Sequence, residues 1–401
     1  MKDLKIFTNN IEESAKEQID LLLEQEPFKN CKIRIMPDVH AGTGCVIGFT
    51  GNLGDKVIPN IVGVDIGCGM LCVELGNIDI DLEKLDKIIR KYIPSGMNVC
   101  EEQIQDYDFE RLICYPLLKN KDNWLGKSLG TLGGGNHFIE IDIDEKNNKY
   151  LVIHTGSRNL GKQVAELYQE KAIHECSYEE EKKFEKEETI RICKSLGLEK
   201  EIQQKLIEIN KKYDGRTKLP KELCYLQGKS REAYLYDMRK CQAFATLNRE
   251  LIANKIISEL LGYGNQLHDF NYFYTIHNYI DFIDNMVRKG SISAKKGEKV
   301  IIPMNMRDGC IIGIGKGNED WNYSAPHGAG RTMSRNMAKE NLKIEDYEKS
   351  MEGIYTTSVN KETIDEAPMV YKPMEEIIKY IEPTIEVKKI IKPIYNFKAS
   401  E

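Results

Sequence analysis

The chain has 401 residues, of which 41% are hydrophobic and 30% charged, and its formal net charge is −6. This composition is typical of a globular protein, and it excludes a membrane protein because no apolar run approaches the roughly 20 residues that span a bilayer. The negative charge argues against indiscriminate binding to nucleic acid, although a local basic groove remains compatible with it.

The first residues contain no apolar segment of the kind that a signal peptide needs. The eleven cysteines are odd in number and include no CxxC pair, so a disulfide framework is not indicated. We therefore expect a cytoplasmic protein without a membrane association.

Four glycine-rich segments carry Asp, Asn, His or Cys, and in chain order they are 36–48 (MPDVHAGTGCVIG), 59–70 (PNIVGVDIGCGM), 127–141 (KSLGTLGGGNHFIEI) and 325–331 (APHGAGR). Short apolar runs such as IVGVDI, HFIEI and YLVIH adjoin these segments or the neighbouring HTGSR turn. We expect each run to form a buried strand beside a polar turn, a place where functional side chains are often held.

Between about 161 and 257 the pattern changes to helix, with a run of charged residues at 179–188 that is typical of a solvated face. Strand-like patterns return at 270–282, 298–305 and 390–401. No repeat or long linker interrupts the chain. We predict an α+β fold in which residues 1–401 form one domain, with a mixed β-sheet core and a helical insertion at about 161–257.

Four of the seven histidines stand where an apolar run meets a turn: His137, His154, His277 and His327. Taken singly, each is more simply read as a structural histidine. Taken with VDIGCGM they suggest a metal site, because Asp65 and Cys68 lie three residues apart among flexible glycines. A carboxylate, a thiolate and imidazoles form a mixed ligand set for divalent transition metals, and on ligand type alone zinc is the first choice. A buried free cysteine in a glycine turn is the competing interpretation.

The segment GTLGGGNHFIE offers backbone N–H groups to phosphate oxygens, but it matches neither common glycine-rich nucleotide motif. The segment HTGSRNLG suits an anion or an ordinary helix start. His327, between Pro326 and Gly328, is a candidate nucleophile toward phosphorus, with Gly330 allowing close approach and Arg331 supplying a cation. We expect RTMSRNMAKE to form a helix whose N-terminal amides add positive potential there.

Several of these motifs, in this order, resemble the RtcB family of GTP-dependent RNA ligases. The similarity runs through nearly the whole chain, in PDVHAGTGCVIG, VDIGCGM, GGGNHFIE, HTGSR, HNY, GKGN, HGAGR, EAPMVYK and a terminal lysine segment. It implies joining of 2′,3′-cyclic phosphate or 3′-phosphate RNA ends to 5′-hydroxyl ends, through a histidine–GMP adduct and a 3′-guanylylated RNA end. The biological setting would be RNA repair or tRNA splicing.

By this resemblance His327 carries GMP, and two manganese ions replace the zinc suggested by ligand type. The implied metal ligands are Asp65, Cys68, His137, His154 and His277. The implied contacts to GTP are Asn136, Glu140, Asn305, Gly328, Ala329, Gly330, Arg331, Tyr371 and Lys398. A monomer is expected, and an activating partner protein is possible in this family.

The chain departs from the family at IPMNMRDG, where Met304 and Asn305 replace Gly and Ser of an IPGSMG-like segment. Asp38 and His40 match a family signature without an evident chemical role, and a structural turn explains them at least as well as catalysis. His174 and His268 lack a motif and are expected to be structural or surface residues. Two other functions use parts of the same site. A metal-dependent RNA phosphoesterase would need the ligands without His327, and a non-catalytic RNA-end binding protein would need neither.

Overall fold

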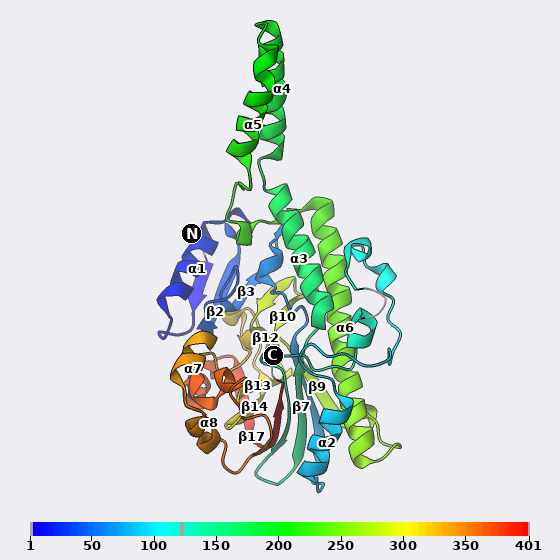
Figure 1. Cartoon of the computed structure of the whole chain (residues 1–401). Helices are drawn as coiled ribbons and strands as arrows, with labels where there is room; N and C mark the ends of the chain where they lie inside the picture. Colours follow the sequence, from blue (N-terminus) through cyan, green and yellow to red (C-terminus); the bar gives the residue numbers. More distant parts are fainter. Residues whose placement is uncertain (1–2, 121–123, 400–401) are drawn as a thin grey trace.

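The computed structural model describes residues 3–120 and 124–399 (Figure 1). Its larger sheet has the order β13-β14-β17-β6-β7-β5-β9, and β16 pairs with β17 beside this path. The strands of this sheet are β5 (Gly69–Gly76), β6 (Phe138–Ile143), β7 (Lys149–Thr155), β9 (Asn271–Ile276), β13 (Lys299–Asn305), β14 (Gly309–Gly315), β16 (Tyr355–Thr356) and β17 (Ile385–Lys398).

The larger sheet curls until its two edge strands meet, and the Ile301 N–H of β13 donates to Thr275 Oγ1 of β9 over 3.1 Å. Side chains alternate along each strand, so β6 turns Phe138 and Glu140 to the inside while Ile139 and Ile141 face outward. The outer face packs against α2 (Leu82–Tyr92) and α6 (Gly228–Leu261). This packing fixes the strand ends at which the polar turns lie.

A second sheet has the order β1-β2-β3-β11-β10. It contains β1 (Asp3–Ile6), β2 (Lys32–His40), β3 (Ile47–Asn52), β10 (Asn278–Asp281) and β11 (Met286–Lys289). Helix α1 (Glu13–Glu24) packs on it through Ala15, Ile19 and Leu22. Two short pairs complete the sheets, β12 (Ser291–Ser293) with β15 (Ser324–Pro326) and β4 (Lys56–Val57) with β8 (Leu226–Gln227).

The helical region is occupied by α3 (Arg158–Glu175), α4 (Glu179–Ser195), α5 (Ile202–Tyr213) and α6. Helices α4 and α5 pack on each other and project from the body as a hairpin, while α3 and α6 lie along it (Figure 1). Three short helices, α7 (Arg335–Asn341), α8 (Ile344–Ser350) and α9 (Met374–Ile381), cover the C-terminal part. None of the helices at residues 3–120 and 124–399 is long and apolar enough to cross a membrane.

The architecture confirms the predicted α+β class and the strands at HFIEI and YLVIH. The strand predicted at IVGVDI is wrong. Residues Pro59–Ile61 form a 3₁₀ turn, and Gly63 and Gly67 adopt positive φ angles of 96° and 77°, which an extended strand cannot contain. The polar turn with Asp65 and Cys68 therefore precedes β5 instead of ending a strand.

Candidate active site

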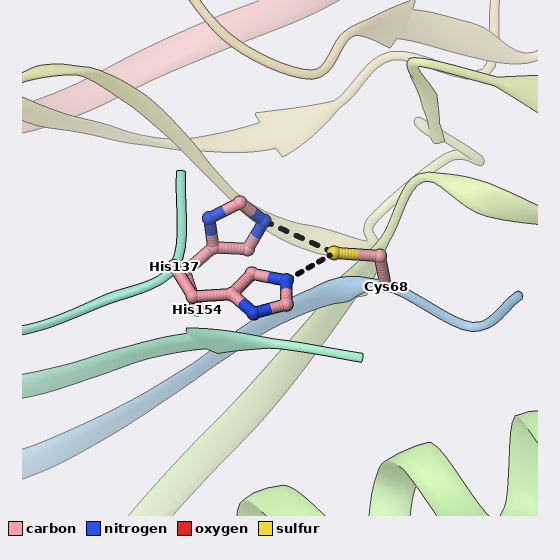
Figure 2. A group of neighbouring side chains, drawn as sticks. All are labelled: Cys68, His137 and His154. Atoms are coloured by element: carbon pink, nitrogen blue, oxygen red, sulfur yellow. Dashed lines mark hydrogen bonds between the residues drawn. The ribbon is translucent and has the colours of Figure 1, made fainter. Parts of the chain in front are cut away.

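The five predicted metal ligands converge at one end of the larger sheet. Asp65 and Cys68 lie in the turn before β5, His137 directly precedes β6, His154 lies near the end of β7, and His277 joins β9 to β10. Cys68 Sγ lies 3.5 Å from His137 Nε2 and 3.3 Å from His154 Nε2 (Figure 2). Further short separations join His154 Nε2 to His277 Nε2 at 3.3 Å and His137 Nε2 to Asp65 Oδ2 at 3.0 Å.

The protonation of two imidazoles shows why this cluster fits a cation. His137 Nδ1 lies 2.9 Å from the Leu132 carbonyl oxygen, and His154 Nδ1 lies 3.0 Å from that of Asn136. A carbonyl only accepts, so both Nδ1 atoms carry the proton and both Nε2 atoms present lone pairs to Cys68. Lone pairs that face a sulfur and a carboxylate at these distances are stabilised by a shared cation.

Ionisation in the cluster follows the same logic. Burial lowers the pKa of His154 and His277 well below the ordinary value, which keeps both rings neutral and able to bind metal. Burial, and then the Asp65 carboxylate, raise the pKa of Cys68 well above the ordinary value. A metal ion reverses this effect because it deprotonates a thiol that it binds. The cluster is thus a candidate metal site of the Asp, Cys and His type.

The ligand-bearing turn is held by hydrogen bonds to its backbone. The Gly67 N–H donates to the Asn278 carbonyl over 2.7 Å, and the His277 N–H donates to that of Cys68 over 3.0 Å. The fully buried Arg249 donates from Nη1 to the Gly67 carbonyl over 2.8 Å and to the Thr155 carbonyl over 2.7 Å. These bonds hold the predicted metal ligands, which come from distant parts of the sequence, in fixed positions relative to one another.

The glycine-rich loop before His137 is shaped for close approach. Gly133 has a φ angle of 90°, and a Cβ atom there would lie 1.8 Å from Arg158 Nη1 and 2.8 Å from His137 Nδ1. Arg158 also donates to Thr131 Oγ1 over 3.0 Å and to the Gly96 carbonyl over 3.1 Å. A larger residue at 133 would displace both Arg158 and a metal ligand.

His327 lies beside the cluster, directly after β15. Its Nδ1 is 2.6 Å from Oδ2 of Asp38, a carboxylate with no exposed surface, and the same oxygen accepts from the N–H groups of His327 at 3.1 Å and Gly328 at 3.3 Å. Asp38 therefore holds the Nδ1–H tautomer and leaves the lone pair on Nε2. The rings of His277 and His327 are 4.9 Å apart between centroids.

The glycines of HGAGR let this loop run against Asp38. Gly330 has a φ angle of 73°, and a Cβ atom there would lie 2.7 Å from the Asp38 carbonyl oxygen. The expected helix after this loop is wrong at its start, because α7 begins only at Arg335, where Ser334 caps the Met337 N–H. Helix-end amides consequently do not act at His327, and the side chain of Arg335 reaches the cavity instead.

A single cavity joins His327 to the predicted nucleotide contacts. Among the residues that line it are all nine predicted GTP contacts: Asn136, Glu140, Asn305, Gly328, Ala329, Gly330, Arg331, Tyr371 and Lys398. His154, His277 and His327 line the same cavity, so the metal cluster opens into it. The structure thus brings every predicted site residue to the cavity or the cluster beside it.

Glu366 organises the far end of this cavity. Its carboxylate lies 2.5 Å from Lys398 Nζ, 2.9 Å from Arg335 Nη2 and 3.2 Å from Arg331 Nη1, and it accepts from the Tyr371 hydroxyl over 2.6 Å. Burial alone would raise the pKa of Glu366, but Lys398, Arg335 and Arg331 outweigh it and lower the pKa to about 2. Three cations share this carboxylate, and within the described part of the chain only Arg335 has a second close carboxylate partner, Asp365 at 2.6 Å, so this end of the cavity keeps net positive charge.

Glu140 is the second carboxyl group of the cavity, and it is buried. Burial raises its pKa to about 8, against the opposing effects of Asn396, which donates to it, and Lys398. Asn305 lines the cavity, but its Oδ1 accepts from the N–H groups of Arg307 and Asp308, and its Nδ2 donates to Asp308 Oδ2 over 2.7 Å. Most of its hydrogen-bonding capacity is used within its own turn.

The sequence interpretation did not identify the structural roles of Asp38, which holds His327, of Glu366, which pairs with the cavity cations, and of Arg249, which holds the ligand-bearing turn. Asp38 and Glu366 stand inside recognised motifs, PDVHAG and EAPMVYK, yet their partners are 289 and up to 35 residues away in sequence. Arg249 lies within a long helix and carries no motif. Only the tertiary contacts reveal these three residues.

The fold and the cluster define a protein with a candidate metal site and a histidine held beside it in a shared cavity. A family profile described as tRNA-splicing ligase RtcB matches residues 23–125 and 115–399, and the chain belongs to this family. The RNA-splicing ligase RtcB of Escherichia coli K12 is 28% identical, over 96% of this chain and 94% of its own length. The tRNA-splicing ligase RtcB of Nanoarchaeum equitans is 26% identical, over 89% and 85%.

Proposed function

We propose that this protein is a GTP-dependent RNA ligase that joins 2′,3′-cyclic phosphate or 3′-phosphate ends to 5′-hydroxyl ends, in RNA repair or tRNA splicing. The observation that carries the proposal is the contact between the buried Asp38 carboxylate and His327 Nδ1, at 2.6 Å. It directs the His327 Nε2 lone pair away from Asp38, as a nucleophile toward phosphorus requires. Family membership supports the same activity.

In this proposal His327 Nε2 attacks the α-phosphorus of GTP, the bond to the β-phosphate oxygen breaks, and pyrophosphate leaves. Water opens a 2′,3′-cyclic end to a 3′-phosphate and a 2′-hydroxyl, and the GMP group then passes from His327 to the RNA 3′-phosphate. Attack by a 5′-hydroxyl on that activated phosphate forms the RNA linkage and releases GMP. Arg331 and Arg335, which line the cavity, would balance phosphate charge.

Asp65, Cys68, His137, His154 and His277 would hold two manganese ions. Bound there, the ions would polarise phosphoryl oxygens and offset the negative charge of the transition state. At the other end of the cavity Glu140, Tyr371 and Lys398 would contact guanine. Because a site built for one base leaves buried groups unpaired with another, GTP should be used in preference to ATP.

The mass of the protein after incubation with manganese and GTP tests the proposal. We expect a GMP adduct with GTP, little or no AMP adduct with ATP, and no adduct in His327→Ala, with His268→Ala as a surface control. A phosphoesterase would open cyclic phosphates without any adduct, and a non-catalytic binding protein would do neither. Wild-type protein that forms no adduct while fully loaded with metal would overturn the proposal.

A second experiment isolates the role of His327. We expect His327→Ala to lose joining of 3′-phosphate ends but to seal RNA that already carries a 3′-guanylylated end, because the final attack needs no histidine nucleophile. Joining of unactivated ends by this variant would remove His327 from the mechanism. Cytoplasmic location, a monomeric state and a need for an activating partner protein stay predictions.

A further inference from the structure

His40 is the one histidine of the cavity that has neither a predicted metal nor a predicted nucleotide role. It ends β2 and lines the cavity together with His154, His277 and His327. The other two unassigned histidines lie elsewhere, since the side chain of His268 is 71% exposed and His174 is on the surface of α3. His40 is half-buried, so part of its ring is open to the cavity.

The tautomer of His40 is set by the backbone. Its Nδ1 lies 2.9 Å from the carbonyl oxygen of Asp38, which only accepts, so Nδ1 carries the proton and Nε2 bears a lone pair. The same residue holds His327 by its side chain. Asp38 thus fixes two imidazoles, and each is left with an unprotonated Nε2.

The loop after His40 is anchored by Glu12, which directly precedes α1, and by Gln18 within α1. The Ala41 N–H donates to Glu12 Oε1 over 2.6 Å, and the Gly42 N–H donates to Gln18 Oε1 over 3.1 Å. Gln18 also donates back to the Gly42 carbonyl over 2.8 Å. These bonds restrain the His40 backbone, so its ring is positioned before any substrate arrives.

The other acidic or basic groups that line the cavity are already committed. Glu366 is paired with Lys398 and two arginines, and burial keeps Glu140 protonated at neutral pH because its pKa is raised to about 8. His154 and His277 belong to the metal cluster, and His327 is the proposed nucleophile. Among the described cavity residues, this leaves His40 Nε2 as an uncommitted proton acceptor.

We propose that His40 is the general base of the sealing step, in which its Nε2 removes the proton from the attacking RNA 5′-hydroxyl. This inference rests on the proposed ligase function. The hydroxyl oxygen forms the new bond to the 3′-phosphate phosphorus, the bond from that phosphorus to the bridging oxygen breaks, and GMP leaves with the electron pair. The proton taken by His40 passes to solvent.

The charged surroundings favour a neutral His40 at physiological pH. Burial lowers its pKa, the Asp38 carbonyl and carboxylate oppose this, and His327 and Arg331 lower it further. Glu12, which bonds to the Ala41 N–H, is the acidic group on the α1 side. Since a base must be unprotonated, sealing should slow as pH falls through the His40 pKa and should level off above it.

The variant His40→Asn separates catalysis from structure, because an Asn Nδ2 can replace the Nδ1 donor to Asp38 but offers no Nε2. The assay supplies manganese-loaded protein with 3′-guanylylated RNA and 5′-hydroxyl RNA in single turnover, without GTP. We expect sealing to fall by about 100-fold or more and its dependence on the His40 pKa to disappear. The matched control is His174→Asn.

The outcomes distinguish this inference from the ligase proposal. If wild-type protein does not seal activated RNA, the ligase function fails; if it seals and His40→Asn seals equally well with the same pH profile, His40 is structural and the inference fails. Adduct formation from GTP in His40→Asn should fall far less than sealing does, and an equal loss would place His40 in the first step instead. In metal-free protein, ¹⁵N NMR should show the Nδ1–H tautomer of His40, and the Nε2–H tautomer would contradict the proposal.

Discussion

The metal end and the far end of the cavity are built in opposite ways. At the metal end, the lone pairs of His137 and His154 face the Cys68 sulfur, and Asp65 lies 3.0 Å from His137 Nε2. At the far end, Glu366 is paired with cations and a hydroxyl, and its charge is balanced.

This difference shows which end depends on a ligand. The metal end collects nitrogen lone pairs, a sulfur and a carboxylate that a shared cation would stabilise, so we expect its stability to be coupled to metal binding. The far end already has its ion pairs without a ligand, but its three cations exceed the charge of Glu366, so an anionic group can bind beside these pairs. The ion pairs also hold the side chains of the far end in place before a nucleotide binds, which lowers the entropy cost of binding.

The largest expected effect is at the metal end. Cys68→Ala should reduce adduct formation and joining by at least about 100-fold and lower the metal content, because the one sulfur ligand is lost. Elemental analysis and adduct mass measure this, with the half-buried Cys100→Ala as the control. Unchanged metal content and activity in Cys68→Ala would remove the sulfur from the metal site.

At the far end, Glu366→Gln should be strongly destabilising, by about 3–5 kcal/mol, because it leaves Lys398 and Arg331 without their buried counter-charge, while Arg335 keeps only Asp365. Urea unfolding measures the change, and the exposed Glu362→Gln is the matched control. A loss below about 1 kcal/mol would mean that solvent, not Glu366, balances these cations.

A smaller and pH-dependent effect is expected at Glu140. Its folded-state pKa of about 8 lies above the ordinary 4.5, so the unfolded chain loses its proton first and stability falls as pH rises from 4.5 to 8. The free energy of unfolding of Glu140→Gln should equal that of the wild type near pH 4.5 and exceed it by about 1–3 kcal/mol near pH 8. Thermal unfolding across this range, with exposed Glu145→Gln as control, measures it; a constant difference would contradict the assigned protonation.

The smallest effect is expected at Asn305. Since its side chain bonds within its own turn, Asn305→Ser should cost about 1 kcal/mol of stability while GTP adduct formation changes little. Parallel unfolding and adduct measurements test this. A large loss of adduct formation with normal stability would show that Asn305 leaves its turn to bind the nucleotide.

Local pattern was sufficient for some elements and insufficient for others. Short apolar runs beside polar turns predicted β6 and β7, whose inward and outward faces are both packed. At 59–66 the same apolar signal was misleading, because Pro59 and the positive φ angles of Gly63 and Gly67 turn the chain. The start of α7 was set by the Ser334 cap, a signal weaker than the helix-forming residues around it.

By itself the sequence determined the chemical kinds at the metal cluster: one thiol, one carboxylate and the imidazoles that stand beside glycine turns, together with the family that these motifs resemble. Tertiary structure decided the pairings, because a hydrogen bond such as Asp38 to His327 joins residues 289 positions apart and leaves no local periodicity. It also decided protonation, since the Asp38 carbonyl that sets the His40 tautomer and the burial that shifts Glu140 are properties of the folded chain alone.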